Sequence, residues 1–297
     1  MAKSFTIVGL GELLWDFLPT GKQLGGAPTN FAYTSYLLGD HAVVASRMGN
    51  DDLGTEAADR LKVLDLSYLQ RDASHPTGTV EVEVRRGGQP RFTIHEHVAW
   101  DFLQWSTKWK KLAATADAVC FGTLAQRSPQ SRTTIVQFLK HTEAVRIFDV
   151  NLRQRFYSAE NVRASIAPAT IVKMNEFELP VILKLLGLPQ SKTPAKRLLE
   201  FGPKLVCITR GSRGSLLVTR NRTVEHPGFK VRVIDTVGAG DAFTAGLAHE
   251  YLRDASLERM SDTANRLGSW AATQSGGTPA TTMKALRRAL KALEANH

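Results

Sequence analysis

The residues DTVGAGDAF, at positions 235–243, combine a glycine turn with an acidic side chain at the start of a helical pattern. Gly238, Ala239 and Gly240 leave backbone N–H groups free at that helix start, where the helix dipole adds positive potential, so the turn can bind an anion. Asp241 places a negative charge at the same position. Its carboxylate either stabilises the helix as a first-turn acid or accepts the proton of a hydroxyl that attacks phosphorus. The physical argument alone leaves these two interpretations equal.

A second group of polar residues surrounds GGAPTN, at positions 25–30. Gly25 and Gly26 let the backbone approach a ligand closely, and Asn30 follows about one helical turn later. Asp16 lies just past the end of the first apolar strand. A carboxylate with a nearby amide at that edge of a sheet suits recognition of neighbouring hydroxyl groups. A plain glycine turn before a helix is the alternative.

The elements that must position these residues alternate along the chain. Apolar strand patterns occur at 4–11, 41–49, 116–122, 144–151, 169–175 and 204–211. Helical patterns follow several of them, at 28–39, 51–64, 128–140 and 176–187. Continuous apolar strands separated by helices predict an α/β fold with a mostly parallel sheet covered on both faces. The active site of such a sheet lies beyond the carboxyl ends of its strands.

One segment breaks the alternation of strand and helix. Residues 77–98 alternate through Val80, Val82 and Val84, turn at RRGGQP, and return through Phe92 and Ile94. This pattern predicts a β-hairpin inserted in the α/β chain, in a position suited to a lid. We expect one domain over residues 1–297, with lid elements around 12–20 and 77–98. The hairpin leaves two assemblies open, a homodimer paired edge to edge or a monomer with a free flap.

Composition excludes several classes of protein. The formal net charge is +10, but the basic residues are scattered and carry no interleaved aromatic side chains, so we expect no specific nucleic-acid partner. Attraction of a phosphorylated small molecule is an equally good use of this charge. The C-terminal segment, with Leu286, Leu290 and Leu293 at helical spacing, predicts an amphipathic surface helix. No apolar stretch reaches the ~20 residues of a membrane helix and no signal pattern is present, which predicts a cytoplasmic protein without a membrane partner.

At this point the motifs match a known family. GGAPTN early and DTVGAGDAF late resemble the two signatures of the ribokinase-like (PfkB) carbohydrate kinases, and RMGNDDLG, DVNLR, KMNEFE, ITRGSRG and ATQSGGTPA agree with the same family. The resemblance covers essentially the whole chain. GELLWDFLP, GGAPTNFA and FTIHEHVAWD look most like the bacterial fructokinases. The resemblance implies a three-layer ribokinase-like fold, with a mostly parallel central sheet, helices on both faces and a small β lid.

The resemblance also implies roles for individual residues. In the catalytic group Asp241 is the base, and the other members are the anion-hole residues Gly238, Ala239 and Gly240 together with Arg153. The sugar-binding group is Asp16, Gly25, Gly26, Asn30 and His95. The nucleotide-binding group is Asn175, Thr209, Gly211, Gly214 and Asn265. Glu178, with Asn175, organises Mg²⁺ partly through water. A monovalent-cation site, for K⁺ in many members, matches Asp235, Val237, Ala271 and Gly276.

Two of these residues have alternative interpretations. Arg153 lies near the reacting groups in fructokinase-type members, where it steadies phosphate oxygens or substrate, but it could also be a surface arginine after a strand. His95 falls about where the kinases of keto-deoxy sugar acids carry an arginine for the substrate carboxylate. A histidine over the sugar therefore favours a neutral substrate.

The predicted function is ATP-dependent transfer of the γ-phosphate to a primary hydroxyl of a neutral sugar, most closely fructose. The same fold could act on a 2-keto-3-deoxy sugar acid, on ribose or on a nucleoside, since Phe17, Trp100 and Trp105 could stack on a base. A non-catalytic sugar sensor is a third option. Loss of the base or of the anion-hole glycines would be expected there, and both are present.

Overall fold

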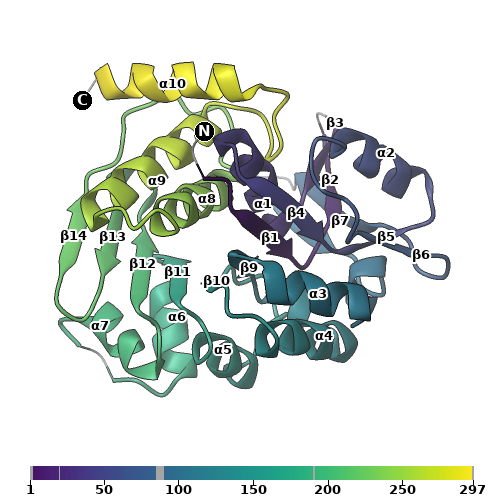
Figure 1. Ribbon diagram of the computed structural model, residues 1–297, viewed down its shortest axis with the longest axis horizontal. Helices are drawn as coiled ribbons and strands as arrows, with labels where there is room; N and C mark the ends of the chain where they lie inside the picture. The colour runs from purple at the N-terminus through teal and green to yellow at the C-terminus, as the bar shows by residue number, and fades with distance from the viewer. Residues whose placement is uncertain (1–2, 20, 85–89, 190, 296–297) are drawn as a thin grey trace.

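A computed structural model describes residues 3–19, 21–84, 90–189 and 191–295. Its centre is an eight-stranded sheet in the order β14-β13-β12-β11-β10-β9-β1-β4, seen in Figure 1. The strands are β1 (Thr6–Leu10), β4 (His41–Ala45), β9 (Ala118–Phe121), β10 (Val145–Asp149), β11 (Ile171–Asn175), β12 (Leu205–Thr209), β13 (Ser215–Val218) and β14 (Thr223–His226). In this order, β12, β11, β10, β9, β1 and β4 pair in parallel with their neighbours. At the other edge β13 pairs antiparallel with β12, and β14 pairs antiparallel with β13. The predicted mostly parallel sheet is confirmed.

Helices cover both faces of this sheet (Figure 1). One face carries α1 (Ala27–Leu38), α8 (Ala239–Tyr251) and α9 (Leu257–Ala272). The other carries α3 (Thr107–Thr115), α4 (Pro129–Lys140), α5 (Ala159–Ile166), α6 (Glu178–Leu185) and α7 (Pro194–Leu198). Outside these layers lie α2 (Asp52–Arg60) and α10 (Met283–Ala295), and single 3₁₀ turns form at Ala99–Phe102, Leu124–Gln126, Leu199–Phe201 and Gly211–Arg213.

The alternation of side chains along each strand builds the two cores. In β9, Val119 belongs to the core that contains Phe138 of α4, whereas the next residue, Cys120, belongs to the core that contains Phe243 of α8 on the opposite face. Both strand residues are buried, as a parallel strand covered on two faces requires. The three-layer arrangement therefore follows from strands that present apolar side chains to both faces.

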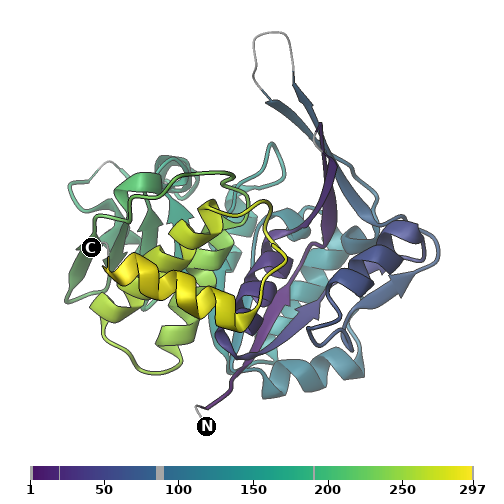
Figure 2. The same ribbon diagram turned by 90° about the horizontal axis from the view of Figure 1, so that it is seen from above.

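A second, four-stranded sheet stands away from the layered body, as Figure 2 shows. It contains β3 (Gly21–Gly25), β2 (Leu14–Leu18), β7 (Gly78–Val84) and β8 (Pro90–Ile94), in that order. The antiparallel pairing of β7 and β8, with Val80 opposite Ile94, confirms the predicted hairpin. The predicted turn at RRGGQP covers residues 85–90. Residues 85–89 lie outside the described residues, and Pro90 is the first residue of β8. The strand β3 was not predicted, because Gly25 was interpreted as part of a turn.

The predicted strand at 41–49 is wrong as a single element. It ends at Ala45, and β5 (Arg47–Gly49) leaves the main sheet to pair with β6 (Gln70–Asp72). A buried ion pair of 2.8 Å between Arg47 and Asp72 accompanies the new pairing. The redirected chain connects the main sheet to the elements that support the small sheet.

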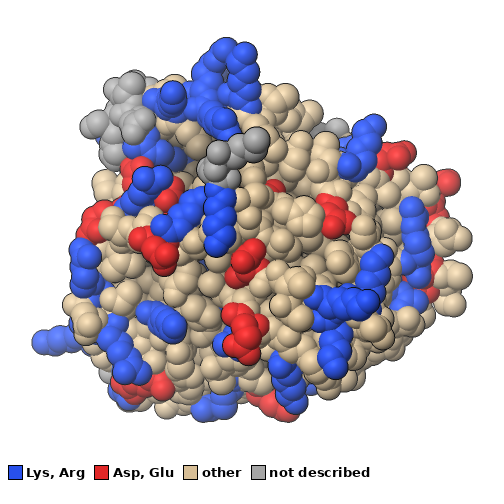
Figure 3. Space-filling view, viewed as in Figure 1, with Lys and Arg blue, Asp and Glu red and all other residues tan. Residues whose placement is uncertain are grey.

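The C-terminal segment forms the predicted amphipathic helix, α10. Leu286 is fully buried and Leu290 and Leu293 pack against the same core, while Lys284, Arg287, Arg288 and Lys291 are exposed. On the face drawn in Figure 3, lysine and arginine side chains alternate with acidic ones and form no continuous stripe. Among the described residues, no helix is both long and apolar enough to cross a membrane.

Candidate active site

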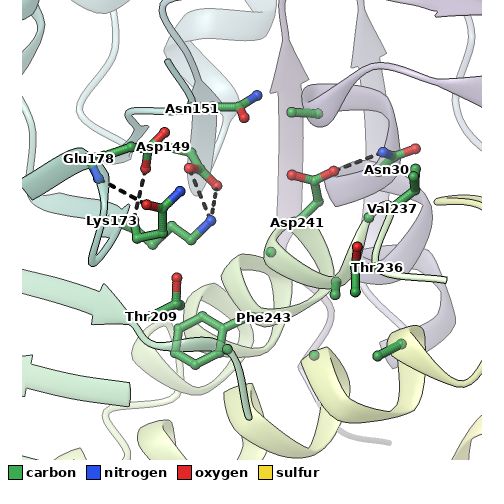
Figure 4. Close-up of a pocket in the computed structure, with 18 of the residues that line it drawn as sticks. Asn30, Asp149, Asn151, Lys173, Glu178, Thr209, Thr236, Val237, Asp241 and Phe243 are labelled. Carbon is green, nitrogen blue, oxygen red and sulfur yellow. Dashed lines mark hydrogen bonds and ion pairs between the residues drawn. The ribbon is translucent and has the colours of Figure 1, made fainter. Parts of the chain in front are cut away.

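A cleft of about 1040 Å³ lies between the small sheet, the carboxyl ends of β10, β11 and β12, and the first turn of α8. This is the edge of the main sheet where the sequence predicted the site. Figure 4 shows Asp241 and Asn30 on one side of the cavity and Asp149, Lys173 and Glu178 on the other. The cleft therefore gathers residues that are far apart in the chain.

The start of α8 has the geometry of an anion site. Gly238 is its N-cap in the left-handed conformation (φ 77°), and Val237, Gly238, Ala239 and Gly240 all line the cleft. The N–H of Ala239, one of the expected anion-hole groups, donates to the carbonyl of Thr236 at 3.2 Å and so has an acceptor within the protein. In the described part of the chain, the N–H groups of Gly240 and Asp241 have no acceptor. These two groups are free to bind an anion.

Asp241 does not behave as a helix cap. Its carboxylate accepts no hydrogen bond from the backbone of α8 among the described residues, and instead accepts one from Nδ2 of Asn30 at 2.8 Å. Burial raises the pKa of Asp241 to about 6, and the charge of Asp149 adds to this, while Lys173 and Asn30 oppose it. A carboxyl group with such a pKa is ionised at neutral pH and can still accept a proton. Asp241 is thus a first-turn acid of α8 whose carboxylate is held from outside the helix.

Most of the residues expected to bind sugar line the cleft, together with Arg153 of the catalytic group, and the exceptions are Gly25 and His95. Asp16 of β2, Asn30 of α1, Gly26 and the exposed Arg153 line the cavity. Gly25 does not line it but ends β3 beside Asp16, and a Cβ there would lie 2.6 Å from Oδ2 of that carboxylate. Burial raises the pKa of Asp16 to about 6, while Arg153 opposes the rise.

Glu12 is a site residue that the sequence reading missed. It lies in the loop between β1 and β2, is 1% exposed and lines the cleft, and its Oε2 is buried without a hydrogen-bond partner among the described residues. Burial raises its pKa to about 7; its own N–H opposes this and the charge of Asp241 adds to it. The signal in the sequence was an acidic residue inside the apolar run GLGELLW.

The opposite end of the cleft is held together by Asn175 and Glu178. Oδ1 of Asn175 accepts the N–H groups of Phe177 and Glu178, both at 2.9 Å. The two carboxylate oxygens of Glu178 accept the N–H of Leu152 at 2.7 Å and that of Asn175 at 2.8 Å. Glu178 thereby joins the loop after β10 to the loop after β11, and both loops border the cavity.

The remaining residues expected at the nucleotide also line the cleft. Thr209 ends β12, and Gly211 and Gly214 flank the turn that follows it. Asn265 of α9 is buried, and its Nδ2 donates to Oγ of Ser215 at 2.8 Å and to the carbonyl of Ser261 at 2.7 Å. Its amide nitrogen is therefore bound by the protein itself.

A buried ion pair of Asp149 and Lys173 was also missed. The two residues are direct partners in the register of β10 and β11, and Nζ of Lys173 lies 3.1 and 3.0 Å from the two carboxylate oxygens. Both line the cleft. The sequence signal was one charged residue near the end of each of two apolar strands, in RIFDVN and TIVKMN.

Besides Gly25, four expected site residues do not line the cavity. The expectation that His95 contacts the sugar is not met, because side chains alternate along β8: Ile94 lines the cleft, whereas His95 faces Glu81, with Nε2 and Oε1 3.3 Å apart. Asp235, Ala271 and Gly276 lie behind the start of α8. The carboxylate of Asp235 accepts the N–H groups of Val237 and Gly276, each at 3.0 Å, and so connects the loop before α8 to the loop after α9.

The model of the pfkB family carbohydrate kinases matches residues 19–283 of this chain. The chain belongs to that family. As a pfkB-family carbohydrate kinase it is a phosphotransferase that acts on a sugar hydroxyl, and its fold is the ribokinase-like fold of its structural neighbours.

Three relatives illustrate the similarity of this pfkB-family kinase. Fructokinase-1 of Oryza sativa subsp. japonica is 28% identical over 93% of this chain and 94% of its own length. Fructokinase of Escherichia coli is 28% identical over 91% and 94%. The crystal structure of fructokinase from Vibrio cholerae O395, in its fructose, ADP and calcium ion bound form, has a TM-score of 0.80 at 26% identity and covers 98% of each chain.

Proposed function

We propose that this carbohydrate kinase transfers the γ-phosphate of ATP to a primary hydroxyl of a neutral sugar, with fructose as the first candidate. The observation that carries the proposal is the position of Asp241, whose carboxylate shares the first turn of α8 with two free N–H groups. A base and an anion site are thus adjacent in one cleft. The relatives named fructokinase support the choice of sugar.

The charge at the sugar end supports a neutral substrate. Glu12, Asp16 and Asp241 bring three carboxyl groups to this end, and Arg153 is the basic residue among them. Carboxylates accept hydrogen bonds from sugar hydroxyls but repel the carboxylate of a sugar acid. The small sheet contributes the apolar side chain of Val80, which can cover a sugar without adding charge.

Different groups of this chain act on the sugar hydroxyl and on the phosphoryl group during the transfer. The sugar oxygen forms a bond to the γ-phosphorus as the bond from that phosphorus to the β–γ bridging oxygen breaks, and ADP leaves. The proton of the attacking hydroxyl passes to the carboxylate of Asp241, which Asn30 holds in place. The N–H groups of Gly240 and Asp241 donate to the phosphoryl oxygens, where negative charge is carried in the transition state.

The opposite end of the cleft suits Mg²⁺ with the nucleotide. Glu178 provides carboxylate oxygen atoms, the kind of ligand that Mg²⁺ prefers, and Asn175, whose Oδ1 already accepts two backbone N–H groups, holds the turn that carries Glu178. Each carboxylate oxygen of Glu178 accepts one backbone N–H, which leaves a lone pair on each for a metal-bound water. When bound, Mg²⁺ neutralises phosphate charge. Thr209, Gly211, Gly214 and Asn265 would border the nucleotide.

A monovalent cation such as K⁺ is proposed behind the anion site, at Asp235, Val237, Ala271 and Gly276. The support is the pair of hydrogen bonds that the carboxylate of Asp235 accepts, which joins the loop before α8 to the loop after α9. A cation there would stabilise the turn that presents Gly240 and Asp241. Turnover measured in potassium and in tetramethylammonium buffers tests this, and equal rates would contradict it.

A panel of sugars with Mg-ATP tests the function as a whole. ADP release is followed for fructose, other neutral hexoses and pentoses, nucleosides and 2-keto-3-deoxy sugar acids. The proposal expects turnover on a neutral sugar, with fructose preferred. Turnover confined to acids or nucleosides would overturn the substrate class while leaving the kinase activity in place.

A further inference from the structure

Lys173 is a buried cation that the roles above leave unused. Its side chain is 8% exposed, and two of its N–H bonds are directed at the two oxygens of Asp149, at 3.1 and 3.0 Å. Asp149 is fixed in turn, because Oγ1 of Thr244 donates to its Oδ2 at 2.9 Å. An ammonium group has three N–H bonds. The hydrogen bonds of the described residues supply no acceptor for the third.

The position of this ammonium group is defined by α8. A Cβ placed on Gly240 would lie 2.8 Å from Nζ of Lys173, so the lysine lies directly against the first turn of that helix. Figure 4 shows Lys173 reaching into the cavity from the side opposite Asp241. The third N–H is therefore beside the free N–H groups of Gly240 and Asp241.

Burial alone does not account for a charged lysine at this place. Desolvation acts to lower the pKa of Lys173, but the carboxylates of Asp149, Asp241 and Glu178 outweigh it and raise the pKa above its ordinary value. A buried ion pair is often no more stabilising than apolar residues of the same size. A cation kept charged at an anion site is explained better by an anion that binds there.

We propose that Lys173 binds the transferred phosphoryl group, donating its third N–H to an oxygen of the γ-phosphate at the start of α8. This inference rests on the proposed function, whose bond making and breaking it leaves unchanged. Lys173 keeps its proton throughout, because the hydroxyl proton passes to Asp241. Asp149 and Thr244 act as positioning residues, since they hold the lysine and not the phosphate.

The test compares the dissociation constants of Mg-ATP and Mg-ADP by calorimetry, without sugar. The variant K173M leaves Asp149 buried and unpaired, so K173M/D149N is measured beside it, and K173R tests rescue by a cation that retains N–H donors. A hydrogen bond to a charged group predicts a ~10–100-fold rise in the Kd of Mg-ATP for K173M and K173M/D149N. The Kd of Mg-ADP, which lacks the γ-phosphate, should not change, and K173R should recover part of the loss.

The matched control removes another buried ion pair. Arg127 and Asp101 are each 5% exposed, bond at 2.8 Å and do not line the cleft. R127M/D101N should therefore leave the ratio of the two dissociation constants as in the wild type. An unchanged ratio in both lysine variants, or an equal weakening of Mg-ATP and Mg-ADP, overturns the inference.

The outcome is independent of the sugar assignment. A wild-type chain that binds Mg-ATP but phosphorylates no neutral sugar refutes the proposed substrate, while the ratio of dissociation constants still decides the role of Lys173. A wild-type chain that does not bind Mg-ATP overturns both proposals.

Discussion

Nδ2 of Asn30 donates a hydrogen bond of 2.8 Å to the carboxylate of Asp241, although 211 positions separate the two residues in the chain. The bond connects α1 to α8, two helices packed side by side on one face of the sheet. The other amide atom, Oδ1 of Asn30, is buried without a partner among the described residues. It can accept a hydrogen bond from the sugar whose hydroxyl we propose that Asp241 deprotonates.

Replacing Asn30 should impair the base as well as sugar binding. Loss of a hydrogen bond to a charged group predicts a ~10–100-fold fall of kcat/KM for N30A. In a D241N background the same substitution should have a smaller effect, because the two residues act together. Steady-state kinetics of the two single variants and the double variant check this. Fully additive losses would contradict the coupling.

The activity should fall on the acid side of neutrality. Burial raises the pKa of Asp241 to about 6; Asp149 adds to the rise, while Lys173, Asn30 and Arg153 oppose it. The base works only as a carboxylate, so kcat is maintained above pH 6 and decreases about tenfold per pH unit below it. Asp16 has a pKa in the same range. The profile of D16N at saturating sugar should therefore keep the acid limb.

Glu12 should destabilise the fold when it is ionised. Its pKa is about 7 in the folded chain against 4.5 ordinarily, so its contribution to stability is full below pH 4.5 and is lost as the pH rises through 7. E12Q stays neutral, and should raise the free energy of unfolding at pH 8 by an amount on the order of a few kcal/mol. At pH 5 the two proteins should differ little.

Urea unfolding at both pH values measures this difference. E143Q, at an exposed carboxylate, is the matched control and should have the same small effect at pH 5 and pH 8. If E12Q is no more stable than the wild type at pH 8, ionisation of Glu12 does not lower the free energy of unfolding.

Glu178 should control the requirement for Mg²⁺. Its two oxygens hold the loops after β10 and β11 through the N–H groups of Leu152 and Asn175. E178Q can accept only one of these bonds, so the Mg²⁺ concentration for half-maximal rate should rise and the fold should lose ~1–3 kcal/mol. The carboxylate of the neighbouring Glu176 pairs with Arg213 and, among the described residues, accepts no N–H from either loop, so E176Q should keep the wild-type Mg²⁺ response. Equal responses of the two variants would refute this role.

The sequence predicted most of the fold because its signals are local. Strands with apolar residues on both faces and the alternating hairpin at 77–98 indicate the main sheet and the hairpin of the small sheet without any information from distant residues. The division of 41–49 into β4 and β5 depends on a distant partner, Asp72, and no local pattern contains it. The strand β3 was missed for a similar reason, since GKQLG acquires its strand conformation by pairing with β2.

Residues of the site were predicted where they belong to a recognisable motif. They were missed where only strand pairing in the folded chain brings them together. Asp241, Asn30 and Glu178 belong to recognisable motifs and line one cleft. Lys173 becomes informative only through its register partner Asp149, and the parallel pairing of β10 and β11 sets that register. The expected position of His95 over the sugar was not met because the face of the hairpin on which His95 lies depends on the strand register. Alternation of residue types alone does not specify that register.

Turnover by D241N, measured beside the wild type with fructose and Mg-ATP, tests the central claim that Asp241 is the base. Asparagine keeps the size of the side chain and can still accept the hydrogen bond from Asn30, but it cannot accept the proton. We expect kcat to fall ~10²–10⁴-fold while the Kd of Mg-ATP stays at the wild-type value. A D241N variant with wild-type kcat would contradict the claim.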